Sequence, residues 1–188
     1  MDTPYPSRKR LDHRGPLSIG TTDAVYFITI AAAERGTTEL SDKTDAILSA
    51  ARYYQSAGKW FLHLFLIMPD HIHMLVHVPT ISVESGVPGG HVLPSPTVMV
   101  GRGVPDAPQP PRGLAKTIGD FKSFLSKKHR IGFQANFFDT RIRDREHFAE
   151  KWNYICQNPV AKGLVPCARE WPHSIAFDPT TGRERPHR

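Results

Sequence analysis

A hairpin predicted over residues 60–78 constrains this chain more than any other segment. Its first half is apolar at nearly every position, which indicates a strand covered on both faces. Pro69 and Asp70 favour a tight turn, and a second apolar strand follows. Strand side chains alternate between the two faces of a sheet, so His71 and His73 point the same way. The hairpin therefore places two imidazoles side by side.

Two imidazoles on one strand face can hold a divalent cation when a third ligand arrives from elsewhere. Asn158 offers a carbonyl oxygen, a suitable ligand for a hard cation. Tyr154 lies four residues earlier, on the same face of a predicted helix. A tyrosine hydroxyl is a poor nucleophile at its free pKa of about 10, but bound Mg²⁺ or Mn²⁺ can polarise a scissile phosphoryl oxygen. The set predicts a metal-assisted tyrosine nucleophile for a phosphodiester, with Glu150 as a further ligand or proton acceptor.

The charge of the chain favours a polyanionic partner. The net charge is +6 and the sequence pI is about 9.5, values common among nucleic-acid-binding proteins and also found in generically basic ones. Several basic side chains are therefore candidates for contacts with phosphate, although a solvated surface would explain them equally. The candidates are Arg8, Lys9, Arg10, Lys116, Lys122, Lys127, Lys128, Lys151 and Lys162.

Other features exclude several classes of protein. The two cysteines, Cys156 and Cys167, provide neither a disulfide framework nor a cysteine-rich zinc site, and they favour a reducing cytosol. No apolar run approaches the ~18 residues that a membrane-spanning helix needs. We therefore expect a cytoplasmic protein without a membrane partner.

The predicted elements follow the order strand, helix, strand, strand, helix, strand, helix. Ser41 is expected to cap the first helix, and the pair Asn158–Pro159 is expected to end the last one. The first six elements fit an α+β, ferredoxin-like β-α-β-β-α-β sheet with helices on one face. The last helix, which carries Tyr154, is an addition at the C-terminal side.

We expect one domain, over residues 24–174, with three appendages. Residues 1–23 have the composition of an extended basic arm, and residues 175–188 that of an irregular tail. Residues 79–113 contain eight of the 17 prolines and six of the 14 glycines, without periodicity. That composition predicts a flexible insertion within the domain.

Taken together, these residues resemble the single-tyrosine HUH transposases, and most closely the REP-associated tyrosine transposases. One motif is Met-Pro-Asp-His-Ile-His at 68–73. The other is the run at 154–165, which begins with Tyr154 and contains Asn-Pro-Val at 158–160. Further likeness lies at 121–123, 137–144 and 171–174. The chain departs from the family pattern at Thr140, where a histidine is frequent, and at Phe133, where a tryptophan is frequent.

The resemblance implies an enzyme that cleaves and rejoins single-stranded DNA near a hairpin through a covalent 5′-phosphotyrosine intermediate. It places His71, His73 and Asn158 as ligands of Mg²⁺ or Mn²⁺, and Tyr154 as the nucleophile. It further implies a monomer or homodimer in a bacterial-type cytoplasm, associated with the nucleoid when bound to DNA.

Other functions remain open from the residues alone. A ferredoxin-like sheet can bind nucleic acid without cleaving it, and a domesticated relative would bind repeat hairpins in that way. A metal-dependent hydrolase that uses water would leave the tyrosine without a role. Binding alone does not require Tyr154 to lie near His71 and His73, so the positions of these side chains distinguish the classes.

Overall fold

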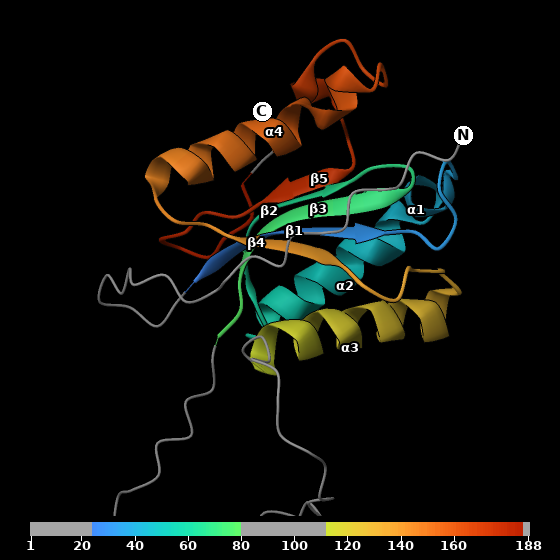
Figure 1. The fold of residues 1–188 in the computed structure, drawn as a ribbon, viewed down its shortest axis with the longest axis horizontal. Helices are drawn as coiled ribbons and strands as arrows, with labels where there is room; N and C mark the ends of the chain where they lie inside the picture. Colours follow the sequence, from blue (N-terminus) through green and yellow to red (C-terminus); the bar gives the residue numbers. More distant parts are fainter. Residues whose placement is uncertain (1–23, 80–111, 186–188) are drawn as a thin grey trace, which may run out of the picture.

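The fold is a five-stranded antiparallel sheet between two layers of helices, in a computed structural model that describes residues 24–79 and 112–185 (Figure 1). The strand order is β4-β1-β3-β2-β5. The strands are β1 (Val25–Ala31), β2 (Phe61–Ile67), β3 (His71–His77), β4 (Phe138–Arg141) and β5 (Ser174–Ala176). The helices are α1 (Glu39–Asp42), α2 (Thr44–Ser56), α3 (Arg112–His129) and α4 (Arg145–Ala161), with a 3₁₀ turn η1 (Ala168–Glu170).

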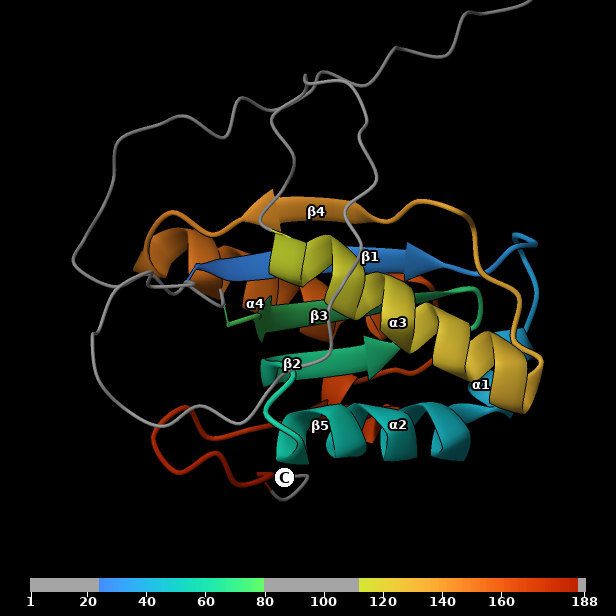
Figure 2. The same cartoon turned by 90° about the horizontal axis from the view of Figure 1, so that it is seen from below.

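The predicted α+β, ferredoxin-like class is confirmed. Figure 2 shows α2 and α3 against one face of the sheet, with α4 behind it on the other. Strand β3 lies at the centre, antiparallel to both β1 and β2. The turn at Pro69 and Asp70 sets the register of the hairpin, in which Leu66 pairs with His73. The predicted arm 1–23 and residues 80–111 of the predicted insertion lie outside the described residues.

The face covered by α2 and α3 holds most of the apolar core. Helix α3 buries an apolar stripe throughout, at Leu114, Ile118, Phe121 and Leu125. Its spacing of three and four residues aligns these side chains along one side of the helix. From β3, the residues at 72, 74 and 76 pack into the same cluster. Each large apolar side chain buried in this way contributes roughly 1.5–3 kcal/mol.

The face covered by α4 holds a smaller apolar cluster beside polar side chains. Ile155 is fully buried against the sheet, with Phe148 and Trp152 packed next to it. Asp144 caps the helix, because its carboxylate accepts a hydrogen bond from His147 N–H at 2.8 Å. Helix α4 therefore crosses the sheet above the face on which His71 and His73 lie.

Two expected helix boundaries are wrong. Ser41 lies inside α1 and its hydroxyl donates to the Thr38 carbonyl at 2.8 Å, so it cannot cap α2, which begins at Thr44. Helix α4 does not end before Pro159 but continues to Ala161. Proline has a helix-compatible φ, although it lacks a backbone donor and its ring crowds the preceding turn. The burial of Asn158 and Pro159 holds this last turn against the sheet.

The expectation of an irregular tail is also wrong at its start. Strand β5 pairs with β2, with Ile175 opposite Phe65. Ile175 and Phe177 alternate in the sequence and are both buried in the core. This short strand covers the edge of β2, which would otherwise present unpaired backbone groups to solvent.

Candidate active site

His71 and His73 lie side by side at the start of β3, with their Nε2 atoms 3.1 Å apart. His73 is only 3% exposed, whereas His71 is partly open to solvent. The alternation of the strand produces this arrangement, since Ile72 between them points into the opposite, α2-covered core.

Two further side chains orient these rings. Asp70 Oδ1 lies 2.7 Å from Nδ1 of His71, and Thr29 Oγ1 lies 2.9 Å from Nδ1 of His73. Thr29 reaches His73 because the two residues are partners in the pairing of β1 with β3. Neither orienting role is predicted from the sequence. The proximity of Asp70 to the histidine pair, and the strand register for Thr29, are the signals that could have revealed them.

Asn158 brings a third polar group to the same place. Its side chain is 7% exposed, and its Nδ2 lies 3.0 Å from Nε2 of His73. The last turn of α4 carries it there, 85 residues away in the sequence. A half-turn of the amide would present Oδ1 in place of Nδ2 at this position.

The electrostatics keep His73 neutral near pH 7. Burial, with a smaller contribution from the charge of His71, lowers the pKa of His73 to about 3, against the opposing influence of Asp70. Burial raises the pKa of Asp70, but hydrogen bonds from His71 and from Gly36 N–H outweigh it, so the net pKa lies below its usual range. Asp70 is thus ionised and His73 keeps a lone pair.

The hydrogen-bond pattern fixes which nitrogen of each imidazole carries the hydrogen. Ionised Asp70 can only accept, so Nδ1 of His71 is the donor and Nε2 of a neutral His71 carries a lone pair. The Asn158 N–H group donates to Nε2 of His73, which leaves Nδ1 of His73 to donate to Thr29. Neither Nε2 atom then carries a hydrogen, and the two lie 3.1 Å apart. Imidazole nitrogens without hydrogens are ligands for a divalent cation, so the residues present fit one.

This donor set contains an amide in place of a third ionisable ligand. Within the described ranges there is no group of three or more His, Cys, Asp or Glu side chains arranged to hold a metal ion. His71, His73 and the Asn158 amide are therefore the side chains that could hold one here.

Tyr154 lies at the rim of this cluster. Its side chain is 51% exposed, and its ring meets the His73 ring edge-on, with centroids 5.5 Å apart. It also meets the buried Phe27 ring edge-on at 5.8 Å, and Phe27 stacks on His73 at 5.4 Å. The structure thus brings together all four residues for which metal or nucleophile roles are predicted. An exposed tyrosine beside buried polar side chains can meet a large substrate without rearrangement of the core.

Other predicted residues of α4 lie near this rim. Glu150 is exposed and pairs with Lys151, with Oε1 and Nζ 2.8 Å apart, and this hydrogen bond lowers the pKa of Glu150. Lys151 Nζ also lies 5.8 Å from the centre of the Phe27 ring. Lys162 follows the last residue of α4 and is exposed. Of these three side chains, Lys151 has the most direct connection to Tyr154, through the Phe27 ring that both contact.

The remaining basic candidates lie elsewhere. Lys116, Lys122, Lys127 and Lys128 belong to α3, on the opposite side of the sheet from Tyr154 (Figure 1). Lys122 Nζ donates to the carbonyls of Gln134 and Ala135 at 2.7 and 2.9 Å, which gives it a structural role. Burial lowers its pKa. The predicted contacts of Arg8, Lys9 and Arg10 fall outside the described residues.

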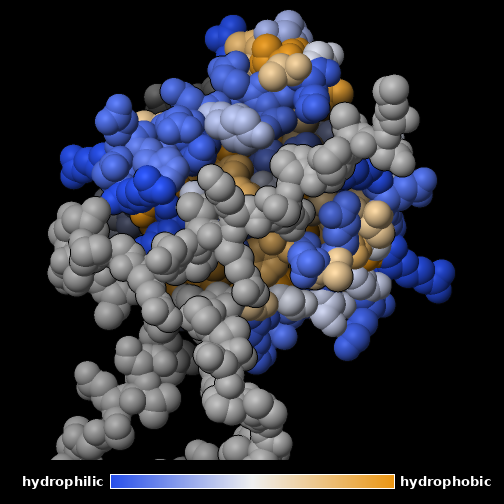
Figure 3. All heavy atoms as spheres, in the orientation of Figure 1, coloured by the Kyte–Doolittle hydropathy of each residue, from blue (hydrophilic) through white to orange (hydrophobic). Residues whose placement is uncertain are grey.

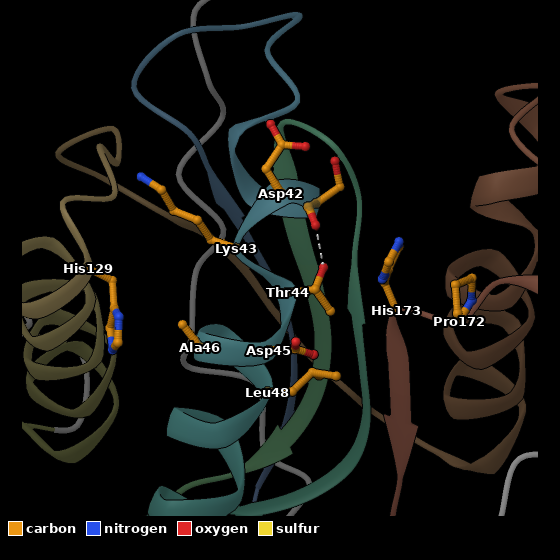
Figure 4. Close-up of a pocket in the computed structure, with 10 residues that line it drawn as sticks. Asp42, Lys43, Thr44, Asp45, Ala46, Leu48, His129, Pro172 and His173 are labelled. Atoms are coloured by element: carbon orange, nitrogen blue, oxygen red, sulfur yellow. Dashed lines mark hydrogen bonds between the residues drawn. The ribbon is translucent and has the colours of Figure 1, made fainter.

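A hollow of about 600 Å³ lies apart from His71 and His73 (Figure 4). Residues 41–46 and Leu48, from the end of α1 and the beginning of α2, line it, with His129 from the end of α3 and Pro172 and His173 before β5. None of the predicted site residues contributes to it. Separately, no helix in the described part of the chain is long and apolar enough to cross a membrane.

Comparison with known proteins gives a relative in sequence and a neighbour in structure. No protein-family model matches the chain. A Haemophilus influenzae protein described as a REP-associated tyrosine transposase is 26% identical over 155 residues, which cover 82% of this chain and 80% of that protein. The solved structure of a REP-associated tyrosine transposase bound to a REP hairpin has a TM-score of 0.54 at 18% identity, over 80% of this chain and 75% of the other. The chain therefore resembles REP-associated tyrosine transposases in sequence and in fold, as the two motifs predict.

Proposed function

We propose that this chain is a DNA strand transferase that cleaves and rejoins single-stranded DNA beside a hairpin. The observation that carries the proposal is the convergence of the Tyr154 ring with His71, His73 and Asn158, from segments about 80 residues apart. A binding module has no need of that arrangement. The two relatives support the assignment, since one is a REP-associated tyrosine transposase bound to a REP hairpin.

The tyrosine oxygen provides the nucleophile. It attacks the phosphorus of the scissile phosphodiester, so that a tyrosine O–P bond forms and the P–O3′ bond breaks. The tyrosine loses its proton, the departing 3′ oxygen gains one, and the product is a 5′-phosphotyrosine with a free 3′ hydroxyl. Because one phosphodiester replaces another, the step is reversible. A new 3′ hydroxyl can attack the phosphotyrosine, which forms a P–O3′ bond and releases the tyrosine. The half-exposed Tyr154 can exchange its proton with solvent.

The chain's other groups position the reaction. His71, His73 and Asn158 would hold Mg²⁺ or Mn²⁺, which when bound polarises the phosphoryl oxygen and offsets its charge. Asp70 and Thr29 fix the tautomers of the two imidazoles, so that their Nε2 atoms face the site. Phe27 supports the rings of both His73 and Tyr154 from below.

An adduct assay tests this function. The protein is mixed with single-stranded hairpin DNA from repeats flanking its gene, in Mg²⁺ or Mn²⁺ and separately in EDTA. We expect a DNA–protein band that survives a denaturing gel, requires metal and disappears in Tyr154→Phe. Tyr53→Phe is the matched control, because Tyr53 is 57% exposed on α2, on the far side of the sheet.

Other outcomes separate the alternatives. An adduct that persists in Tyr154→Phe would contradict the assigned nucleophile. Tight hairpin binding by both proteins, with no adduct in any metal, would favour a relative that binds hairpins without cleaving them. Cleavage without an adduct, unchanged in Tyr154→Phe, would identify a hydrolase that uses water.

A further inference from the structure

Phe138 is an exposed aromatic ring on the same face of the sheet as the candidate site. It begins β4, an edge strand of four residues, and is 48% exposed. Its partner in the pairing with β1 is Thr29, the residue that contacts His73. Paired residues of antiparallel strands project to the same face. Phe138 therefore lies in one row across the sheet with Thr29 and His73.

A single buried ring separates Phe138 from the tyrosine. Phe138 meets Phe27 edge-on, with centroids 6.4 Å apart and an interplanar angle of 70°. Phe27 is in turn the ring that contacts both Tyr154 and His73. Phe27 is 6% exposed and belongs to the core, whereas Phe138 and Tyr154 both open to solvent on either side of it. The three rings form a continuous row. Its two ends, Phe138 and Tyr154, are exposed surface, and Phe27 is the buried ring between them.

The surroundings of this surface are polar and partly cationic. Lys151 Nζ lies 5.8 Å from the centre of the Phe27 ring, and Ala135 and Asn136, shortly before Phe138, are exposed. In Figure 3 the outer surface of α4 is hydrophilic, and apolar surface appears below it at the level of the sheet. Aromatic rings beside cations are the combination that binds single-stranded nucleic acid, because bases stack on the rings and phosphates meet the cations.

We propose that Phe138 is a stacking platform for a base of the single-stranded DNA, beside the phosphodiester that Tyr154 attacks. The inference rests on the proposed function and adds a positioning residue to it. One base held on Phe138 would fix the register of the strand relative to the tyrosine, without touching the reacting atoms.

A nucleobase fits this surface better than a protein partner. A stable protein interface buries about 800 Å² on each side and has an apolar centre. Here a single ring on a four-residue strand stands among polar side chains. The flat face of one base matches one exposed ring, and stacking tolerates any base sequence.

Crosslinking in an uncleaved complex tests the inference. The probe is a hairpin oligonucleotide with a single-stranded flank in which 5-iodouracil replaces one base at a time. The protein is Tyr154→Phe, so that no cleavage occurs. We expect a photo-crosslink to the peptide containing Phe138 at one flank position, and its loss when Phe138→Ala is added. Phe138→Ala should also weaken binding of the flanked hairpin roughly 5- to 150-fold, and Phe138→Trp should restore it.

Phe61→Ala is the matched control. Phe61 is 47% exposed and its ring stacks on His77 at 5.7 Å, so it resembles Phe138 in exposure and in contacting another ring. His77 lies four residues from His73 along β3, roughly 13 Å away.

With Tyr154 present, Phe138→Ala should raise the DNA concentration for half-maximal adduct formation more than it lowers the single-turnover rate.

The outcomes distinguish the inference from the function on which it rests. Adduct formation with equal DNA dependence in wild type and Phe138→Ala, and no crosslink at Phe138, would overturn the inference alone. A crosslink that depends on Phe138 without any adduct in the wild type would overturn strand transfer and keep base stacking. Equal losses of hairpin binding in Phe138→Ala and Phe61→Ala would overturn the inference. Phe138→Leu keeps an apolar side chain at this position without an aromatic ring, so it separates the loss of stacking from a folding defect.

Discussion

The two faces of the sheet differ in what their helices bury. Under α2 and α3, Phe121 is fully buried between the rings of Tyr54, Trp60 and Phe65. Under α4, the buried set includes His73 and Asn158, joined by a hydrogen bond of 3.0 Å. One face is closely packed with aromatic and aliphatic groups, and the other includes polar groups that need partners.

This difference assigns separate tasks to the two faces. Apolar burial on the α2 and α3 face supplies most of the stability. That stability allows the α4 face to retain buried polar side chains, which cost free energy unless they are hydrogen-bonded. The α4 face can therefore expose Tyr154 at the rim of a rigid support.

The strongest test removes the largest ring of α3 from the core. Phe121→Ala should lower the free energy of unfolding by about 3–5 kcal/mol, because it leaves a cavity among three aromatic rings. Urea denaturation followed by circular dichroism measures the change. Tyr154→Phe, on the other face, should change it by less than about 1 kcal/mol, since that ring is 51% exposed. Equal losses would contradict the division of tasks.

The next test disturbs the polar face without disturbing the core. Asp70→Ala removes the acceptor that fixes the tautomer of His71. It should weaken Mn²⁺ binding about 10- to 100-fold, the usual consequence of losing an orienting carboxylate. Isothermal titration calorimetry measures the affinity, and Asp120→Ala on α3 is the control, because Asp120 pairs only with the exposed Lys116 in the described contacts. Unchanged affinity in Asp70→Ala would argue against a metal held by His71.

Much of this division can be predicted from the sequence. The spacing of Leu114, Ile118 and Phe121 predicts the core face of α3, and the alternation at His71 and His73 predicts the polar face. Local patterns of this kind depend only on the periods of helix and strand. The end of α4 beyond Pro159 depends instead on packing against the sheet, which local rules do not contain.

The orienting residues could not be predicted in the same way. Thr29 reaches His73 through strand register, across 44 residues of sequence. Ile175 joins the core as part of a three-residue strand, too short for its alternation to stand out. The lysines of α3 look like phosphate contacts in the sequence, but the fold places them on the opposite face from Tyr154.

A smaller effect is expected from removing single cations on the two faces. Lys151→Ala should reduce the slope of log affinity against log salt for single-stranded DNA by about 0.7, the value for one phosphate contact. Lys127→Ala on α3 should leave that slope unchanged. Fluorescence anisotropy over a salt series measures both. A slope reduced by Lys127→Ala and not by Lys151→Ala would place the DNA on the α2 and α3 face.

The smallest effect concerns pH, which should act selectively on the α4 face. His63 packs edge-on against Phe148 of α4, with ring centroids 5.3 Å apart. Burial, followed by the charges of His77 and Arg185, lowers the pKa of His63 below its ordinary value of 6.5. Among the buried residues described for the α2 and α3 core there is no histidine. Protonation of histidines on the α4 face should therefore lower the free energy of unfolding in acid.

The sign of the pH effect follows from where the proton binds. Below about pH 6.5 the unfolded chain protonates His63 while the folded chain resists, so the free energy of unfolding falls as pH falls. His63→Gln should make that decline shallower between about pH 7 and 5, by at most about 2 kcal/mol at the lower end. Urea denaturation of both proteins at each pH isolates His63, because His73 titrates equally in both. An identical pH dependence would show that His63 is already solvated in the folded chain, and would leave the acid sensitivity of the α4 face to His73.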